Sequence, residues 1–301
     1  MRTGVAAAVV AAAVLGACTG PDEEPPAPIT GETSPPFTGD LYLSIGDSWA
    51  TGFRDAGGES GPTRDAFPQQ VTDVLAARGE EVTLVNLACT GTLAAQALSQ
   101  PGCDAENRAI DGHPYTGTQV EAALDVVAQH PGQVRLVTVV LGGNDLAPCL
   151  PDAADVVPPD SRDCLDRVVP EVADDLAQIA TGLREALGPD VPVVGIGYPD
   201  LWLALGPTQP DVAAETLEVF RDQIDPALRA AFEDAGGSYV DLTATFDGYA
   251  DPAITVPVAG EGAVPAPVAG ICIATYYCSD RDTHPRPEGH RAIARDVVAR
   301  S

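Results

Sequence analysis

The chain has 301 residues, of which 45% are hydrophobic, so it can form one large domain with its own core rather than a disordered polymer. Its 44 acidic and 16 basic residues give a formal net charge of −28, and every one of the 16 is an arginine. A surface this acidic repels phosphate groups, so we expect no nucleic-acid partner.

The start of the chain has the features of an export signal followed by a tether. Arg2 precedes a run of Val, Ala and Leu over residues 5–15, which is too short to span a membrane as a stable helix. Leu15-Gly16-Ala17-Cys18 is similar to a bacterial lipobox, where a signal peptidase cuts before a lipid-modified cysteine. Residues 19–38 are rich in Pro, Gly, Thr, Ser and acidic residues, a composition typical of linkers.

These features divide the chain into residues 1–17 as a lipoprotein-type signal peptide, 18–38 as a flexible Pro-rich tether and 39–301 as the folded domain. A lipid on Cys18 would anchor the protein at the extracellular face of the cell membrane. The alternative is an ordinary signal peptide cut near Ala17, which would release a secreted protein.

From residue 41 onward, short apolar runs alternate with helical patterns. Strands are predicted over residues 41–45, 82–87, 134–141, 191–196 and 239–242, and helices over 67–78, 120–127, 165–183, 212–232 and 287–299. Strands that are apolar throughout are typical of a parallel sheet covered on both faces. The pattern predicts an α/β fold, a three-layer α/β/α sandwich with a mostly parallel, five-stranded, flavodoxin-like sheet. Residues 250–278 carry little helical or strand signal, and so long a stretch is usually a functional loop or a misread element.

Apart from Cys18, the chain has six cysteines, and an even number in an exported chain indicates disulfides. Sequence alone does not choose among the many possible pairings. Pairing of nearest neighbours would close three separate loops without crossing the core, through Cys89–Cys103, Cys149–Cys164 and Cys272–Cys278. A zinc site is the rival interpretation, but the sequence contains neither a CxxC nor an HExxH motif, so we expect no metal.

Polar motifs follow the first three predicted strands. Gly46-Asp47-Ser48 ends the first strand, Gly91 follows the second, and Asn144 follows the third. Because ligand sites in parallel α/β sheets gather at the carboxyl ends of strands, these residues should converge on one edge. Ser48 offers a nucleophile, while its backbone N–H, that of Gly91 and the amide of Asn144 offer donors to an oxyanion. Asp47 and Asp145 are expected to brace their turns by hydrogen bonds.

A serine nucleophile needs a base, and the chain has four histidines. His284 lies in a predicted loop just before the last helix, where it can face the same edge as Ser48. His113 and His130 each precede a proline in predicted surface turns, and His290 falls inside the last helix, where a structural or exposed role is expected. The sequence therefore favours His284 as the base.

This ordered set resembles the SGNH (GDSL-type) hydrolases, whose name lists the four residues that match Ser48, Gly91, Asn144 and His284 here. The resemblance covers about residues 40–300 and is closest to a secreted, disulfide-containing esterase branch that also has a Gly-Tyr-Pro like residues 197–199. It implies the nearest-neighbour disulfide pairing and no metal or organic cofactor. The G-x-S-x-G elbow of common α/β-hydrolases is absent.

One position departs from the family pattern. The family usually has an Asp three residues before the histidine, where this chain has Arg281. Asp282, Asp280 or a backbone carbonyl remains to orient His284, and we favour Asp282, although this residue is also typical of a surface loop.

The leading hypothesis is a monomeric serine hydrolase of carboxylic esters, an esterase or lipase acting on a small-molecule or lipid ester. A carbohydrate deacetylase or acyltransferase using the same residues is one alternative, and a catalytically inactive cell-surface binding lipoprotein is another. The acyl and alcohol pockets are expected from loops 52–65, 104–118 and 250–278, whose shape a single sequence does not reveal.

Overall fold

The structure is a computed structural model that describes residues 37–151 and 157–301. The predicted signal peptide, Cys18 and the tether up to residue 36 lie outside the described residues. A five-stranded sheet forms the centre, in the order β4-β1-β5-β6-β7, with every neighbouring pair parallel. Its strands are β1 (Leu41–Gly46), β4 (Thr83–Asn86), β5 (Val134–Val140), β6 (Val193–Ile196) and β7 (Ser238–Val240).

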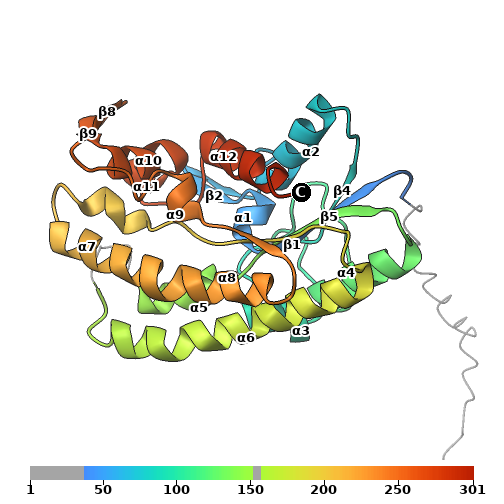
Figure 1. The fold of residues 1–301 in the computed structure, drawn as a ribbon. Helices are drawn as coiled ribbons and strands as arrows, with labels where there is room; N and C mark the ends of the chain where they lie inside the picture. Colours follow the sequence, from blue (N-terminus) through green and yellow to red (C-terminus); the bar gives the residue numbers. More distant parts are fainter. Residues whose placement is uncertain (1–36, 152–156) are drawn as a thin grey trace, which may run out of the picture. The chain divides into compact units, whose positions relative to one another are not determined.

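Helices cover both faces of this sheet, as predicted (Figure 1). One layer contains α2 (Phe67–Ala77), α9 (Leu242–Thr245), α10 (Ala266–Ala274) and α12 (Pro287–Val298). The opposite layer contains α3 (Ala94–Ser99), α4 (Gln119–Gln129), α6 (Ser161–Leu187) and α8 (Asp225–Glu233). All six residues of β1 are buried because this strand is central and covered on both sides, which explains its unbroken apolar sequence. The strand order and layers confirm the flavodoxin-like α/β/α sandwich.

The helix predicted over residues 212–232 is not a regular α-helix. The chain forms α7 (Pro210–Val219), then a π-helical segment η3 (Phe220–Ile224), then α8. Pro226 lies in the first turn of α8 and has no backbone N–H to donate, so the regular hydrogen-bond ladder cannot pass through it. Hydrophobic spacing does not reveal such a change of winding.

Of the two alternatives for residues 250–278, a functional loop or a misread element, the structure supports the second. This stretch forms the hairpin of β8 (Thr255–Val258) and β9 (Gly262–Pro265), then α10 and the start of α11 (Tyr277–Asp280). Helix α10 is apolar on nearly all sides and largely buried, so its sequence has no amphipathic period to detect. A second hairpin, β2 (Arg54–Ala56) with β3 (Glu59–Gly61), lies within the predicted loop 52–65.

Three disulfides close loops of the domain, and they join nearest neighbours in the sequence. The pairs are Cys89–Cys103, Cys149–Cys164 and Cys272–Cys278. Within residues 37–151 and 157–301, no helix combines the length and apolar character needed to cross a membrane.

Candidate active site

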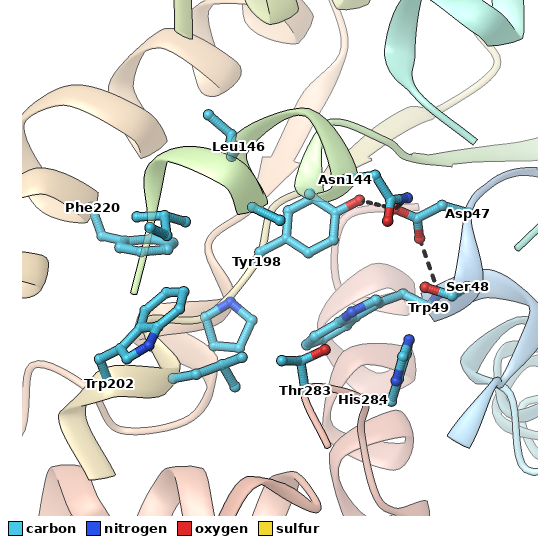
Figure 2. A pocket seen from close by; sticks show the side chains of 15 residues that line it. Asp47, Ser48, Trp49, Asn144, Leu146, Tyr198, Trp202, Phe220, Thr283 and His284 are labelled. Atoms are coloured by element: carbon cyan, nitrogen blue, oxygen red, sulfur yellow. Dashed lines mark hydrogen bonds between the residues drawn. The ribbon is translucent and has the colours of Figure 1, made fainter. Parts of the chain in front are cut away.

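The ends of three separate elements meet at one cavity of about 150 Å³ (Figure 2). Ser48 begins the short helix α1 (Ser48–Thr51) directly after β1, and Asn144 lies in α5 (Gly143–Leu146) directly after β5. His284 enters from the loop before α12, and all three residues line this cavity. The convergence expected for these side chains is therefore present.

The turn that carries Ser48 is held by the buried carboxylate of Asp47. Its Oδ1 accepts a hydrogen bond from the Trp49 N–H at 2.9 Å, and its Oδ2 accepts one from the Tyr198 hydroxyl at 2.5 Å. Burial raises the pKa of Asp47 to about 6, although the hydrogen bonds from Tyr198 and Trp49 oppose that rise. Asp47 thus braces the loop, as the sequence predicted.

The amide of Asn144 lies between two acceptors. Its Nδ2 donates to the backbone oxygen of Thr92 at 3.0 Å and to Asp47 Oδ2 at 3.3 Å. Position 143, just before Asn144, requires glycine, because a Cβ there would lie 2.5 Å from the ring of Tyr198. Asp145 accepts a hydrogen bond from the Ala94 N–H at 3.0 Å, which ties this turn to the start of α3.

The imidazole of His284 is bonded by Asp282 at its Nδ1. His284 Nδ1 lies 2.5 Å from Asp282 Oδ1, and the same oxygen accepts the backbone N–H of His284 at 3.2 Å. The second oxygen, Oδ2, accepts the Asp55 N–H from β2 at 2.7 Å. Burial acts to raise the pKa of Asp282, but the hydrogen bond and charge of His284 and these backbone donors hold it below its usual value.

Asp280, the second candidate carboxylate from the sequence, does not bond His284. Asp280 is exposed and accepts hydrogen bonds from the Gly57 N–H at 3.1 Å and from the hydroxyl of Ser279 at 2.5 Å. Between the two carboxylates, Arg281 adopts a left-handed backbone with φ of 58°. This conformation turns the chain between Asp280 and Asp282, so the two carboxylates face different partners.

The opposite side of the imidazole faces Ser48. In Figure 2 the ring of His284 points toward the side chain of Ser48. The ring of Phe53 packs against the imidazole with centroids 4.9 Å apart. Ser48 itself is only 7% exposed, at the floor of the cavity.

Gly91 is placed differently from the other candidates. It occupies a turn with φ of +84°, in the left-handed region that favours glycine. It does not line the cavity of Ser48 and instead lines a neighbouring one. The next residue, Thr92, provides the carbonyl that binds Asn144.

The remaining histidines lie outside the cavity. His290 is buried in α12 and accepts the Phe67 N–H at 3.1 Å through Nδ1, so its role is structural. Burial chiefly, and the charge of His284, lower its pKa to about 3. The surface position expected for His130 was wrong, since this residue is buried at the end of α4 against Phe37. Phe37 also packs against the half-buried His113.

Beyond Ser48 and His284 the cavity is largely apolar. Its inner wall is formed by indole, phenyl and aliphatic side chains, namely Trp49, Leu146, Leu150, Leu201, Trp202 and Phe220. None of the predicted loops 52–65, 104–118 and 250–278 lines it. Within the described ranges, no cluster of three or more His, Cys, Asp or Glu side chains is arranged to hold a metal ion.

Two supports of the site were missed in the sequence. Tyr198 was noted only as part of a tripeptide motif, yet its hydroxyl anchors Asp47. The β2–β3 hairpin supplies the backbone N–H groups of Asp55 and Gly57 to the two carboxylates before His284. Backbone donors carry no residue-type signal, so no sequence pattern pointed to them.

The order of the motifs matches that of a known protein family. The model of the GDSL-like lipase/acylhydrolase family matches residues 44–292, which includes Ser48, Asn144 and His284. The chain belongs to this family. At the level of its family, the protein is therefore a hydrolase of carboxylic esters.

Solved structures agree on the fold. An extracellular lipase from Streptomyces rimosus superposes with a TM-score of 0.52 at 16% identity, covering 87% of this chain and 100% of that one. The lipase Lip_vut3 from a goat rumen metagenome has a TM-score of 0.51 at 14% identity, covering 87% and 97%. No curated protein matches the chain in sequence. The closer likeness to the disulfide-containing esterase branch stays a prediction.

Proposed function

We propose that the protein is a carboxylic ester hydrolase in which Ser48 is the nucleophile, His284 the general base and Asp282 the residue that orients the base. One observation carries this assignment. Ser48 and His284 share the wall of a single cavity, and a buried carboxylate bonds the far nitrogen of the imidazole. This arrangement supports the order of nucleophile, base and orienting group that serine hydrolysis requires.

In the first step, Ser48 Oγ attacks the carbonyl carbon while its proton passes to His284 Nε2. The tetrahedral intermediate collapses, the C–O bond to the alcohol breaks, and His284 returns the proton to the leaving oxygen. Water then repeats the sequence on the acyl-enzyme and releases the acid. Asp282 bonds Nδ1 throughout, which keeps Nε2 free to accept the proton and stabilises the imidazolium.

The oxyanion is bound, in this proposal, by the N–H of Ser48, the N–H of Gly91 and the amide of Asn144. The bond from Asn144 to Asp47 is long at 3.3 Å, so an oxyanion can take its place while the bond to Thr92 keeps the amide oriented. Gly91 lacks a Cβ, which lets the backbone N–H approach the substrate.

The cavity supports a short acyl group. Its volume of about 150 Å³ is close to that of a protein cavity known to bind benzene, so it accepts roughly six carbon atoms. The apolar wall favours an alkyl chain over a charged one. Phe220 and Trp202 close the inner end (Figure 2).

The test is hydrolysis of p-nitrophenyl acetate, butyrate and laurate by the wild type and Ser48→Ala. The wild type should cleave butyrate best, and the variant should lose on the order of 10⁶ in kcat because the nucleophile and base act as one unit. Removing a single hydroxyl leaves the fold intact, which an unchanged circular dichroism melt would verify. More than a tenth of wild-type activity in folded, uncontaminated Ser48→Ala would contradict the mechanism.

We further propose that the protein is exported and anchored through a lipid on Cys18. Three disulfides support export, because such bonds persist in oxidising compartments. The apolar run and the Leu15–Cys18 motif support the anchor, although they lie outside the described residues. Mass spectrometry of the membrane fraction should find acylated Cys18 as the first residue. A soluble product whose processing and location do not change in Cys18→Ala would contradict the anchor and leave plain secretion.

A further inference from the structure

A second cavity, of about 460 Å³, lies beside the turn that contains Gly91. Its walls come from the loop closed by the Cys89–Cys103 disulfide, which contains α3, from Asp104 and Asn107 just beyond that loop, and from residues 115–119, which lead into α4. Unlike the cavity of Ser48, it is lined mostly by amide, hydroxyl and carboxylate groups. The assigned chemistry uses none of these side chains.

This polar cavity is built on the same loops as the candidate active site. Thr90 lines it, and its hydroxyl bonds that of Thr51, the last residue of the helix that Ser48 begins, at 2.9 Å. The side chain of Gln119 bonds both the N–H and the carbonyl of Gly46, at 2.9 and 3.0 Å. The polar cavity therefore has a fixed position relative to the nucleophile.

The turn of Gly91 and Thr92 joins the wall of the polar cavity to Asn144 in the wall of the apolar one. Thr92 lines the polar cavity and accepts the hydrogen bond of Asn144, which lines the apolar one. Gly91 is exposed, and no atom lies within 4 Å of the position that a Cβ would take. A substrate bound at Ser48 can therefore extend over this residue into the polar cavity.

Several side chains of the polar cavity have donors or acceptors that bond no other group of the protein. In the part of the chain that the structure describes, the exposed side chains of Gln100 and Asp104 and the partly buried one of Asn107 make no hydrogen bond within the protein, although all three line the cavity. Gln96 uses its side-chain oxygen to accept the Leu93 N–H, which leaves its NH₂ group for a ligand. Tyr115 adds a partly buried ring. Donors and acceptors are thus present side by side, the arrangement that hydroxyl groups satisfy best.

The charged groups of the polar cavity limit the class of ligand further. Among the described residues, no arginine or histidine lines the polar cavity, and the one charged group that does is the carboxylate of Asp104. A phosphate or carboxylate on the ligand would meet no cation here and would face a like charge. The chemistry therefore fits a neutral ligand.

We infer that the polar cavity binds the alcohol part of the substrate and that this alcohol is neutral and rich in hydroxyl groups, a sugar or a small polyol. The inference rests on the proposed function and assigns opposite characters to the two halves of the ester. The short acyl group lies in the apolar cavity, the carbonyl lies between Gly91 and Asn144, and the hydroxylated alcohol extends past Gly91.

The experiment compares three butyrate esters that differ only in the alcohol, namely ethyl butyrate, glycerol monobutyrate and a methyl glucoside 6-butyrate. At least one hydroxylated ester should exceed ethyl butyrate in kcat/KM by about tenfold, the effect of one or two added hydrogen bonds. A higher value for the glucoside identifies a sugar, and a higher value for the glycerol ester identifies a small polyol.

The variants Gln100→Leu and Asn107→Leu should each lower the ratio of kcat/KM for the preferred hydroxylated ester to that for ethyl butyrate by about threefold to tenfold. Gln69→Leu, on the exposed face of α2, is the matched control and should leave the ratio unchanged. Equal kcat/KM values for all three esters, or a ratio unmoved in both cavity variants, would overturn the inference while ethyl butyrate hydrolysis still upheld the proposed function. Failure to cleave any of the three would overturn both.

Discussion

At the scale of single residues, the spacing before His284 is the feature that sets this chain apart. The family usually has its acid three positions before the histidine, and here that position is Arg281 in a left-handed conformation. Asp282 nevertheless lies against Nδ1, and hydrogen bonds from Asp55 and from His284 itself fix the carboxylate there. A carboxylate two positions before His284 thus has the geometry to bond its Nδ1 in place of the usual carboxylate three positions before.

Asp282→Asn should lower kcat by up to about 10⁴, by analogy with the same change in a serine protease triad. The amide would still fill the space but would no longer favour the proton on Nδ1 or stabilise the imidazolium. Asp280→Asn is the matched control and should change kcat less than about tenfold, since Asp280 bonds Gly57 and Ser279 rather than His284.

Measuring kcat for both variants with one ester separates the remaining interpretations. Near-normal rates in both would leave a dyad of Ser48 and His284 without a carboxylate. A large loss in Asp280→Asn alone would mean that the loop rearranges when substrate binds.

At the scale of elements, the loop from Cys89 to Cys103 bears on both cavities. It carries Gly91 and Thr92, it contains α3, and Asp145 caps α3 by accepting the Ala94 N–H. The disulfide constrains this loop in the unfolded chain, so removing the disulfide should cost stability.

The double variant Cys89→Ser/Cys103→Ser should lower the free energy of unfolding by about 3 kcal/mol, the chain-entropy value for a loop of this length. Cys272→Ser/Cys278→Ser, whose cysteines are 6 residues apart instead of 14, should cost nearer 2 kcal/mol. Urea unfolding monitored by circular dichroism measures both. Equal stability of either double variant and the wild type, or six free thiols in exported wild type, would contradict this account.

At the scale of the whole molecule, buried carboxyl groups link stability to pH, and Asp200 and Asp225 do so with a higher pKa than Asp47. Asp200 accepts hydrogen bonds from Thr216 and from the Trp202 N–H, and Asp225 accepts one from Tyr239. Burial is the main cause that raises the pKa of each to about 7, from an ordinary value of 3.8. The folded state therefore holds these protons at pH values where the unfolded chain has lost them.

Because the folded state binds more protons between pH 3.8 and about 7, these two groups make stability fall as pH rises through that window. The buried His290, with its pKa lowered to about 3, acts in the opposite direction and costs stability as pH falls below 6.5. The loss of stability due to the carboxyl groups should appear when unfolding at neutral or mildly alkaline pH is compared with unfolding at pH 5.

Asp225→Asn removes one of these titrations, so its stability relative to the wild type should be higher at pH 8 than at pH 5. Urea unfolding at both pH values gives the difference, which should be a few kcal/mol at most. Asp222→Asn is the control, because Asp222 is exposed and paired with Arg221, and it should follow the wild-type profile. Parallel profiles of Asp225→Asn and the wild type would rule out Asp225 as the titrating group.

Much of this molecule follows from sequence alone. The strands could be predicted because central parallel strands are apolar throughout, and helices such as α6 because one buried stripe repeats at helical spacing. The motifs at Ser48, Asn144 and His284 could be placed at one edge because chain connectivity in a parallel sheet brings the carboxyl ends of strands together.

Other features depended on the tertiary structure because they rest on contacts between distant segments. Helix α10 has no amphipathic period since it is apolar on nearly every side, and only packing shows that residues 250–278 are ordered elements. The carboxylate of Asp282 is held by the Asp55 N–H, 227 positions away in the chain, and the Tyr198–Asp47 bond joins residues 151 positions apart. The division of the site into an apolar and a polar cavity arises only when loops separated in the chain fold against one another, so no local pattern encodes it.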